Sequence, residues 1–283
     1  RRFCMTPLFD AHNHLHDPRF RDHLADLPAA MHAAGIKRCV VNGSCEEDWP
    51  LVVELARLFP DLVLPSLGLH PWKIAARSPD WQHTLENMLS PSTPKAFLGE
   101  CGLDLWMEDP AFEAQREVFT VQLGIAARYD LPLTVHCLRA WGPLLEILHS
   151  HPRPDRGFLL HSYGGAPDLV DELVHLGAYF SFSGPALAKN RQKVRDSLRR
   201  VPLHRLLCET DAPEMLPPPS YRPHEALDAR GEALNHPANL PAIVNGVARF
   251  LGHSPTTFAS ALGRNFHAFF GLPSGPCENL HGI

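Results

Sequence analysis

Short apolar segments rich in Val, Leu and Phe alternate along this chain with longer segments of helical period. This alternation predicts eight strands, at about 8–14, 37–43, 62–70, 96–104, 131–137, 157–162, 178–184 and 205–211. It also predicts helices between and after them, at about 20–34, 46–59, 79–89, 111–129, 141–150, 167–176, 189–200 and 238–250. Strands that alternate with helices form parallel βαβ units, and eight such units are the number that closes a barrel.

The end of the first strand separates a barrel from an open sheet. An open doubly wound sheet would follow its first strand with a glycine-rich phosphate-binding turn, but this strand ends in His-Asn-His. We therefore expect an α/β fold with a single (β/α)8 TIM barrel over residues 8–270. Residues 1–7 would be an N-terminal extension, and 271–283 would be a C-terminal tail. An extra C-terminal helix at about 254–270 would pack outside the barrel, and 212–237 would be a long loop.

The composition fits a domain of this size and excludes several other classes of protein. The 283 residues are 45% hydrophobic and 20% charged, which is typical of a globular chain and not of a disordered or collagen-like one. No apolar run reaches the roughly 18 residues of a membrane span, and we expect no signal peptide at residues 1–4. The seven cysteines are scattered without a Cys-x-x-Cys pair. We expect reduced thiols, a cytoplasmic location, no membrane partner and no obligate protein partner.

Ionisable side chains stand at the carboxyl ends of five expected strands, where a TIM barrel places its active site. They are His12, His14, Glu100, His136, His161 and Asp211. One buried ionisable group can be satisfied by a hydrogen bond in the core, but six at one rim are best paired through a shared cation. Four imidazoles and two carboxylates suit Zn, Mn, Fe or Ni. Six ligands exceed what one open catalytic ion needs, which favours two metals.

Six short motifs in order resemble one known family. DAHNH, GLHPW, GECGLD, LTVHC, HSYGG and ETDAP together are similar to the TatD family of metal-dependent hydrolases, in the amidohydrolase-like barrel group, over about residues 8–270. Many relatives in the wider group bridge their metals with a carboxylated lysine at strand 4. Here Glu100 stands in that strand and Lys95 lies before it, which favours the TatD branch. The resemblance implies a TatD-like hydrolase domain with DNase activity, which removes nucleotides from a 3′ end.

The resemblance also implies roles for the expected ligands. Glu100 would bridge two divalent ions (Mg, Mn or Zn), one shared with His12, His14 and Asp211, the other with His136 and His161. A water between such ions becomes a nucleophile because its pKa falls. Glu100 and Asp211 are therefore the expected catalytic residues, with Asp211 as the general base.

Three further carboxylates share strand faces with the expected ligands. Asp10, Asp104 and Glu209 could orient imidazoles through hydrogen bonds, which is how residues behind a metal ligand commonly act. Each could equally make an ordinary hydrogen bond inside the barrel.

Substrate contacts are less clearly marked, because the net charge of −5 lacks the basic footprint of a duplex-binding protein. His70, Arg139 and Tyr163 are the candidates for substrate binding, and each could instead make only local contacts. Trp72 could stack a base or pack locally. Family members often place an arginine two residues after the strand-5 histidine, but this chain has Leu138 there and Arg139 one residue later.

Three functions remain open at this point. The preferred hypothesis is a two-metal phosphodiesterase with single-stranded DNA or nucleic-acid ends as substrate. The alternative is a hydrolase of a small ester, lactone or amide, or of an ester attached to RNA, that uses the same metals. A third hypothesis is a non-catalytic barrel that acts as an interaction module, against which the complete set of ligands argues.

Overall fold

The structure is a computed structural model that describes residues 6–90 and 94–273. Eight parallel strands pair with one another in the order of the sequence. They are β1 (Leu8–Asn13), β2 (Ile36–Gly43), β3 (Val63–Leu67), β4 (Phe97–Asp104), β5 (Leu133–Leu138), β6 (Phe158–Leu160), β7 (Ala178–Phe182) and β8 (Leu206–Cys208). Every residue of β4 is buried, as expected of a strand that is covered on both faces.

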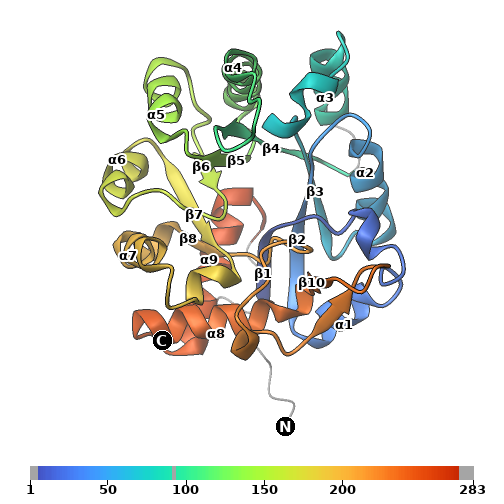
Figure 1. Ribbon diagram of the computed structural model, residues 1–283, viewed down its shortest axis with the longest axis vertical. Coiled ribbons are helices and arrows are strands. Elements are labelled where there is room, and N and C mark those ends of the chain that lie inside the picture. Colours follow the sequence, from blue (N-terminus) through green and yellow to red (C-terminus); the bar gives the residue numbers. More distant parts are fainter. Residues whose placement is uncertain (1–5, 91–93, 274–283) are drawn as a thin grey trace.

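Helices follow the strands and form a ring around them in sequence order (Figure 1). They are α1 (Leu27–Ala33), α2 (Trp49–Leu58), α3 (Trp81–Leu89), α4 (Phe112–Tyr129), α5 (Trp141–Ser150), α6 (Val170–His175), α7 (Gln192–Arg200) and α8 (Leu240–Leu251), with α9 (Pro255–Phe270) last. The predicted TIM barrel with an extra C-terminal helix is confirmed. In the described ranges, no helix is both long and apolar enough to cross a membrane.

The barrel closes between β1 and the segment that follows β8. The Asp211 amide donates to the His12 carbonyl at 2.9 Å, and the His14 amide donates to the Ala212 carbonyl at 2.7 Å. The carboxylate of Asp10 reinforces this join, since it accepts hydrogen bonds from the Thr210 amide at 2.9 Å and from the Thr210 hydroxyl at 2.5 Å. The closing seam therefore carries three of the expected ligands on adjacent backbone.

Helix α9 closes the amino-terminal end of the barrel. Its phenylalanines form one buried cluster with side chains from five strands: Ala11, Val40, Phe97, Leu159, Leu207, Phe266, Phe269 and Phe270. Because these strands lie around the whole barrel, the cluster fills the barrel interior at that end. The expectation that α9 packs outside the barrel was wrong, because its aromatic face covers the open floor and leaves only the opposite rim accessible.

Two other expectations need correction. The helix expected at 20–34 is a 3₁₀ turn at Pro18–Phe20 followed by the shorter α1, because Pro28 lacks an amide hydrogen and fits only the first turn of a helix. The loop expected at 212–237 contains a small antiparallel hairpin, β9 (Glu225–Leu227) and β10 (Ala233–Asn235). The division into an extension at 1–7, a domain and a tail at 271–283 stays a prediction, because much of both end segments lies outside the described residues.

Candidate metal centre

The six ionisable side chains expected at the strand ends converge at the carboxyl-terminal rim of the barrel. We call them the ligand cluster: His12 in β1, His14 just after it, Glu100 in β4, His136 in β5, His161 after β6 and Asp211 after β8. His12, Glu100, His161 and Asp211 are buried, whereas His14 and His136 are half-buried. The cluster thus reaches from the interior of the barrel to its open rim.

Unusual backbone at the strand ends positions these side chains. Asp211, with φ +53°, and Ser162, with φ +41°, adopt the left-handed conformation that non-glycine residues rarely use. Such conformations cost of order 1–3 kcal/mol and persist where the surrounding structure holds them. In β4, Gly102 has φ +149°, and a Cβ there would lie 1.9 Å from the His136 carbonyl oxygen. Only glycine therefore lets β4 and β5 approach closely enough to bring Glu100 beside His136.

Four atoms of the cluster form a first group around one carboxylate oxygen of Glu100. His12 Nε2, His14 Nε2, Glu100 Oε2 and Asp211 Oδ1 lie 3.2 to 3.5 Å from one another in the pairs measured. Most of these separations exceed a normal hydrogen bond. They match the spacing of about 3.3 Å between neighbouring ligands of a tetrahedral ion with bonds of about 2.0 Å. The first group therefore fits a divalent cation.

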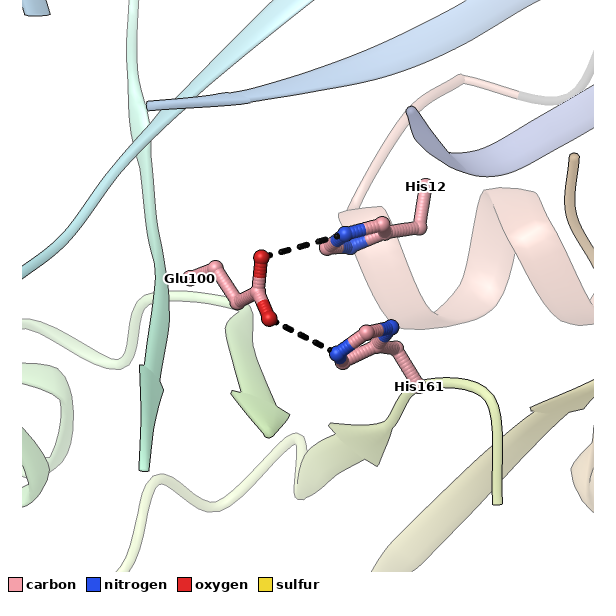
Figure 2. Close-up of side chains that lie close together, drawn as sticks. All are labelled: His12, Glu100 and His161. Atoms are coloured by element: carbon pink, nitrogen blue, oxygen red, sulfur yellow. Dashed lines mark ion pairs between the residues drawn. The ribbon is translucent and has the colours of Figure 1, made fainter. Parts of the chain in front are cut away.

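The other carboxylate oxygen of Glu100 faces a second group. Glu100 Oε1 lies 2.8 Å from His161 Nε2, 3.1 Å from His136 Nδ1 and 3.2 Å from His70 Nε2. Figure 2 shows Glu100 between His12 and His161, with a different oxygen directed at each ring. Glu100 is thus the only residue of the ligand cluster whose two oxygens contact both groups, which is the arrangement of a bridging ligand.

Hydrogen bonds on the far side of the rings decide which nitrogens can bind a metal. His14 Nδ1 lies 2.8 Å from the Asn42 carbonyl oxygen, which can only accept, so Nδ1 carries a hydrogen and Nε2 is the nitrogen that can bind either a proton or a metal. His136 Nε2 lies 2.9 Å from Asp104 Oδ2, so the ring hydrogen on Nε2 is donated to that carboxylate and Nδ1 is the nitrogen that can bind a metal. Both of these nitrogens face Glu100.

His70 has the opposite arrangement. Its Nδ1 accepts a hydrogen bond from the Trp72 amide at 3.1 Å, so the ring hydrogen is on Nε2, which donates toward Glu100 Oε1. The pKa of His70 is lowered to about 4, because burial, with smaller contributions from His136 and His161, outweighs the attraction of Glu100. His70 is therefore a neutral hydrogen-bond donor directed into the site, and a poor metal ligand. The GLHP motif gives the sequence signal, because its histidine caps the 3₁₀ turn Pro71–Ala76.

The three supporting carboxylates have different positions. Asp104 contacts the His136 ring directly and also accepts hydrogen bonds from Trp72 Nε1 and the Trp106 amide, each at 2.7 Å. Asp10 contacts no imidazole: it accepts from the His12 amide at 3.4 Å, from Asn13 and from Thr210. Asp10 therefore fixes the seam between β1 and β8, which is the second of its two expected alternatives, an ordinary hydrogen bond inside the barrel.

Glu209 lies behind His161. Its Oε1 is 3.7 Å from His161 Nδ1 and accepts hydrogen bonds from the Ser162 amide at 2.7 Å and the Ser162 hydroxyl at 2.6 Å. The hydroxyl of Ser181 donates to its other oxygen. Glu209 therefore has little capacity left for a metal, and it stabilises the turn that carries His161.

The buried carboxylates of the ligand cluster are stabilised by positive charge on the nitrogens beside them. Burial alone would raise the pKa of Glu100, but His161, His70 and His12 hold it well below its ordinary value. Burial also opposes the charged form of His14 and His161, yet Glu100 together with Asp211 or Glu209 raises the pKa of both rings well above the usual range. Protons thus occupy the nitrogens that a cation would take, so the donor set fits divalent metal ions.

Two expected substrate contacts lie outside the ligand cluster. Tyr163 is 1% exposed, its hydroxyl donates to the Ala166 carbonyl at 3.0 Å, and its ring packs on Trp141. This position leaves Tyr163 no free surface for a substrate, so we remove it from the candidate site. Arg139 is exposed at the rim, and its guanidinium lies 5.5 Å from the ring centre of Trp106. The sequence analysis missed Trp106, although a large apolar residue in a loop after a strand could have marked it as a candidate.

Comparisons with known proteins point to one family. Residues 9–271 match the family model described as TatD related DNase. The Escherichia coli metal-dependent hydrolase YjjV is 34% identical over 208 residues, which cover 73% of this chain and 79% of that protein. The 3′-5′ ssDNA/RNA exonuclease TatD of Salmonella typhimurium is 28% identical over 264 residues, 93% of this chain and 98% of that protein. The crystal structure of YjjV covers 94% of this chain and 98% of its own, with a TM-score of 0.85 and 28% identity.

Proposed function

The chain belongs to the family of TatD-related DNases, and we propose that it is a metal-dependent hydrolase that removes nucleotides from the 3′ end of single-stranded nucleic acid. The observation that carries this proposal is the position of Glu100. One of its oxygens faces His12 and His14, and the other faces His136 and His161. Two groups of donors that share one carboxylate are suited to a two-metal attack on a phosphodiester.

Each proposed metal position has its own set of protein ligands. His12, His14, Asp211 and Glu100 Oε2 would hold one ion, and His136, His161 and Glu100 Oε1 would hold the other. The second set has only three ligands, which leaves a position open, as catalytic metal sites do. Imidazole-rich ligands favour Zn over Mg. Ions held there would stabilise negative charge on phosphoryl oxygens and lower the pKa of a water molecule.

Residues of the chain supply the remaining steps of the proposed hydrolysis. Burial raises the pKa of Asp211, but His14, His12 and His161 outweigh it and keep the carboxylate ionised at neutral pH. Asp211 would accept the proton that the attacking water loses. His70, neutral and with its hydrogen on Nε2, would donate a hydrogen bond to a phosphoryl oxygen as charge develops there.

One assay tests this function. Metal-stripped protein is given Mg, Mn or Zn separately and incubated with single-stranded oligonucleotides labelled at the 3′ or the 5′ end. We expect stepwise shortening from the 3′ end with at least one ion, and none with chelator present. Intact oligonucleotide with every ion, in protein that has taken up metal, would overturn the proposal.

The second candidate is a hydrolase of a small ester, lactone or amide, or of an ester attached to RNA. The net charge of −5 and the apolar Leu138 beside the site favour a small or weakly charged substrate. The same assay separates the two candidates, because a small-ester hydrolase would bind metal and leave the oligonucleotide intact. A cytoplasmic location and the absence of an obligate protein partner stay predictions.

A further inference from the structure

Two exposed tryptophans stand beside the ligand cluster, and we propose that they form a stacking subsite for the unpaired nucleobase next to the scissile phosphodiester. This inference rests on the proposed function. Trp72 is 57% exposed and Trp106 is 62% exposed, whereas Trp49 and Trp81 are buried. Large aromatic rings are usually well buried, so two exposed indoles at the mouth of one site call for a ligand.

A single carboxylate holds both tryptophan positions. Asp104 Oδ2 accepts from the Trp72 indole Nε1, and Asp104 Oδ1 accepts from the Trp106 backbone amide, both at 2.7 Å. The same Oδ2 is 2.9 Å from His136 Nε2. The Trp72 ring centre lies 6.3 Å from that of His136 and 5.2 Å from that of His70. A base held by these indoles would therefore be fixed relative to His70 and His136.

Arg139 adds a cation to the subsite. Its guanidinium carbon lies 5.5 Å from the centre of the Trp106 ring, within the range of a cation–π contact. Arg139 has a left-handed backbone conformation, with φ +58°, directly after β5. A guanidinium next to an indole offers a nucleotide both a planar surface and a positive charge for its phosphate.

The chemistry of this subsite selects single strands. Indole rings recognise the face of a base, and every base has such a face, so stacking gives little preference among sequences. In a duplex both faces of an internal base are covered by its neighbours. The expected ligand of this subsite is therefore the unpaired base at the end of a single strand. Holding it would orient the adjacent phosphodiester for attack.

Trp106 is the better residue to test, because only its backbone amide contacts Asp104. Trp106→Ala keeps that hydrogen bond and removes the ring. Loss of the Trp72 ring would also remove a hydrogen bond to Asp104, the carboxylate that contacts His136. The chain offers a matched control in Tyr129, which is 54% exposed with the Arg128 guanidinium 5.6 Å from its ring centre. Tyr129 ends α4 just before β5, at the opposite end of the barrel.

The experiment uses the metal-loaded protein and two kinds of oligonucleotide. One carries a normal base at the scissile position, and the other carries an abasic residue there. Cleavage is measured as kcat/KM, and binding is measured with a phosphorothioate version that resists hydrolysis. In wild-type protein we expect both quantities to favour the normal base by roughly 5- to 150-fold, the usual effect of one stacked base. Trp106→Ala should lose most of this preference, Trp106→Phe should keep part of it, and Tyr129→Ala should keep all of it.

The two readouts separate failure of the subsite from failure of the proposed function. Cleavage with no preference for the base, or a preference that is undiminished in Trp106→Ala, would overturn the subsite and leave the exonuclease in place. Binding that prefers the base and depends on Trp106, without any cleavage, would support the subsite and contradict the exonuclease. A metal-loaded protein that neither binds nor cleaves these strands would overturn both the subsite and the exonuclease.

Discussion

Asp104 Oδ2 lies 2.9 Å from His136 Nε2, on the opposite side of the ring from the nitrogen that faces Glu100. Burial would raise the pKa of Asp104, but hydrogen bonds from His136, Trp106 and Trp72 lower it to about 2. Asp104 therefore stays ionised at neutral pH and accepts the ring hydrogen. This contact selects the tautomer of His136 that can bind a metal.

Asp104→Asn should weaken metal binding, because an amide group can present a hydrogen to His136 and so favour the wrong tautomer. Loss of such a supporting contact typically costs roughly 10- to 100-fold in metal affinity. Titration of metal-stripped protein with Zn or Mn measures this change. Asp109→Asn is the matched control and should bind as wild type, because Asp109 is an exposed carboxylate in the loop that follows β4. Equal affinity in Asp104→Asn and wild type would contradict the role given to Asp104.

His70→Ala should slow hydrolysis and leave the metal content unchanged. The reason is the tautomer, since His70 Nε2 donates a hydrogen bond and has no lone pair for an ion. Removal of one donor to a developing oxyanion typically lowers kcat by roughly 100-fold or more. Metal analysis of the purified variant is the decisive companion measurement. Loss of one metal per chain would show that His70 is a ligand instead.

Asp211→Asn should lower the rate by roughly 100- to 10,000-fold, as expected when a general base is lost. The amide oxygen can still contact a metal, so most of the metal should remain bound. Glu214→Gln is a suitable control, because Glu214 is an exposed acid on the same loop, paired with Arg19 at 2.6 Å. A rate in Asp211→Asn equal to that of the control would remove Asp211 as the base.

The metal-free protein should become less stable as the pH rises above about neutral. Burial alone would lower the folded-state pKa of His14, His136 and His161. Glu100 acts on all three rings, together with Asp211 at His14, Asp104 at His136 and Glu209 at His161. These carboxylates outweigh burial and raise the three pKa values above the ordinary 6.5. Below pH 6.5 both the folded and the unfolded chain hold these protons. Above it the unfolded chain releases them first, so the free energy of unfolding falls until the folded chain also releases them.

Thermal unfolding between about pH 6 and about pH 9 checks this dependence. Divalent ions should displace the same protons, so metal binding should release protons and should tighten as the pH rises. A metal-free midpoint that rises over this range would contradict the assigned charges. Proton release can be followed with a pH indicator in weak buffer as Zn is added.

The ligand cluster could be predicted from the sequence because its residues lie at strand ends. Apolar strand patterns with a histidine or carboxylate at the carboxyl end locate His136, Glu100 and Asp211 on one rim once the barrel is recognised. The orientation of Asp10 could not be predicted in this way. A register shift between Asp10 and Asn13 interrupts the regular alternation of β1, so Asp10 contacts Thr210 and not an imidazole ring.

Contacts between distant segments explain the other differences. The position of α9 depends on how Phe266 and Phe269 fill the barrel floor, and periodicity identifies an amphipathic helix without saying which surface it covers. The burial of Tyr163 depends on Phe180 and Trp141, which come from other elements. Trp106 had no motif around it, and its contact with Arg139 appears only when β4 and β5 are adjacent.

The metal content of purified variants tests the central claim that Glu100 bridges two ions. After loading with Zn or Mn and removal of loosely bound metal, wild-type protein should contain two ions per chain. His136→Ala should keep one, Glu100→Ala should keep neither tightly, and His149→Ala on the exposed face of α5 should keep both. Circular dichroism would confirm that each variant is folded. One ion in wild-type protein, or two in folded Glu100→Ala, would contradict a shared carboxylate.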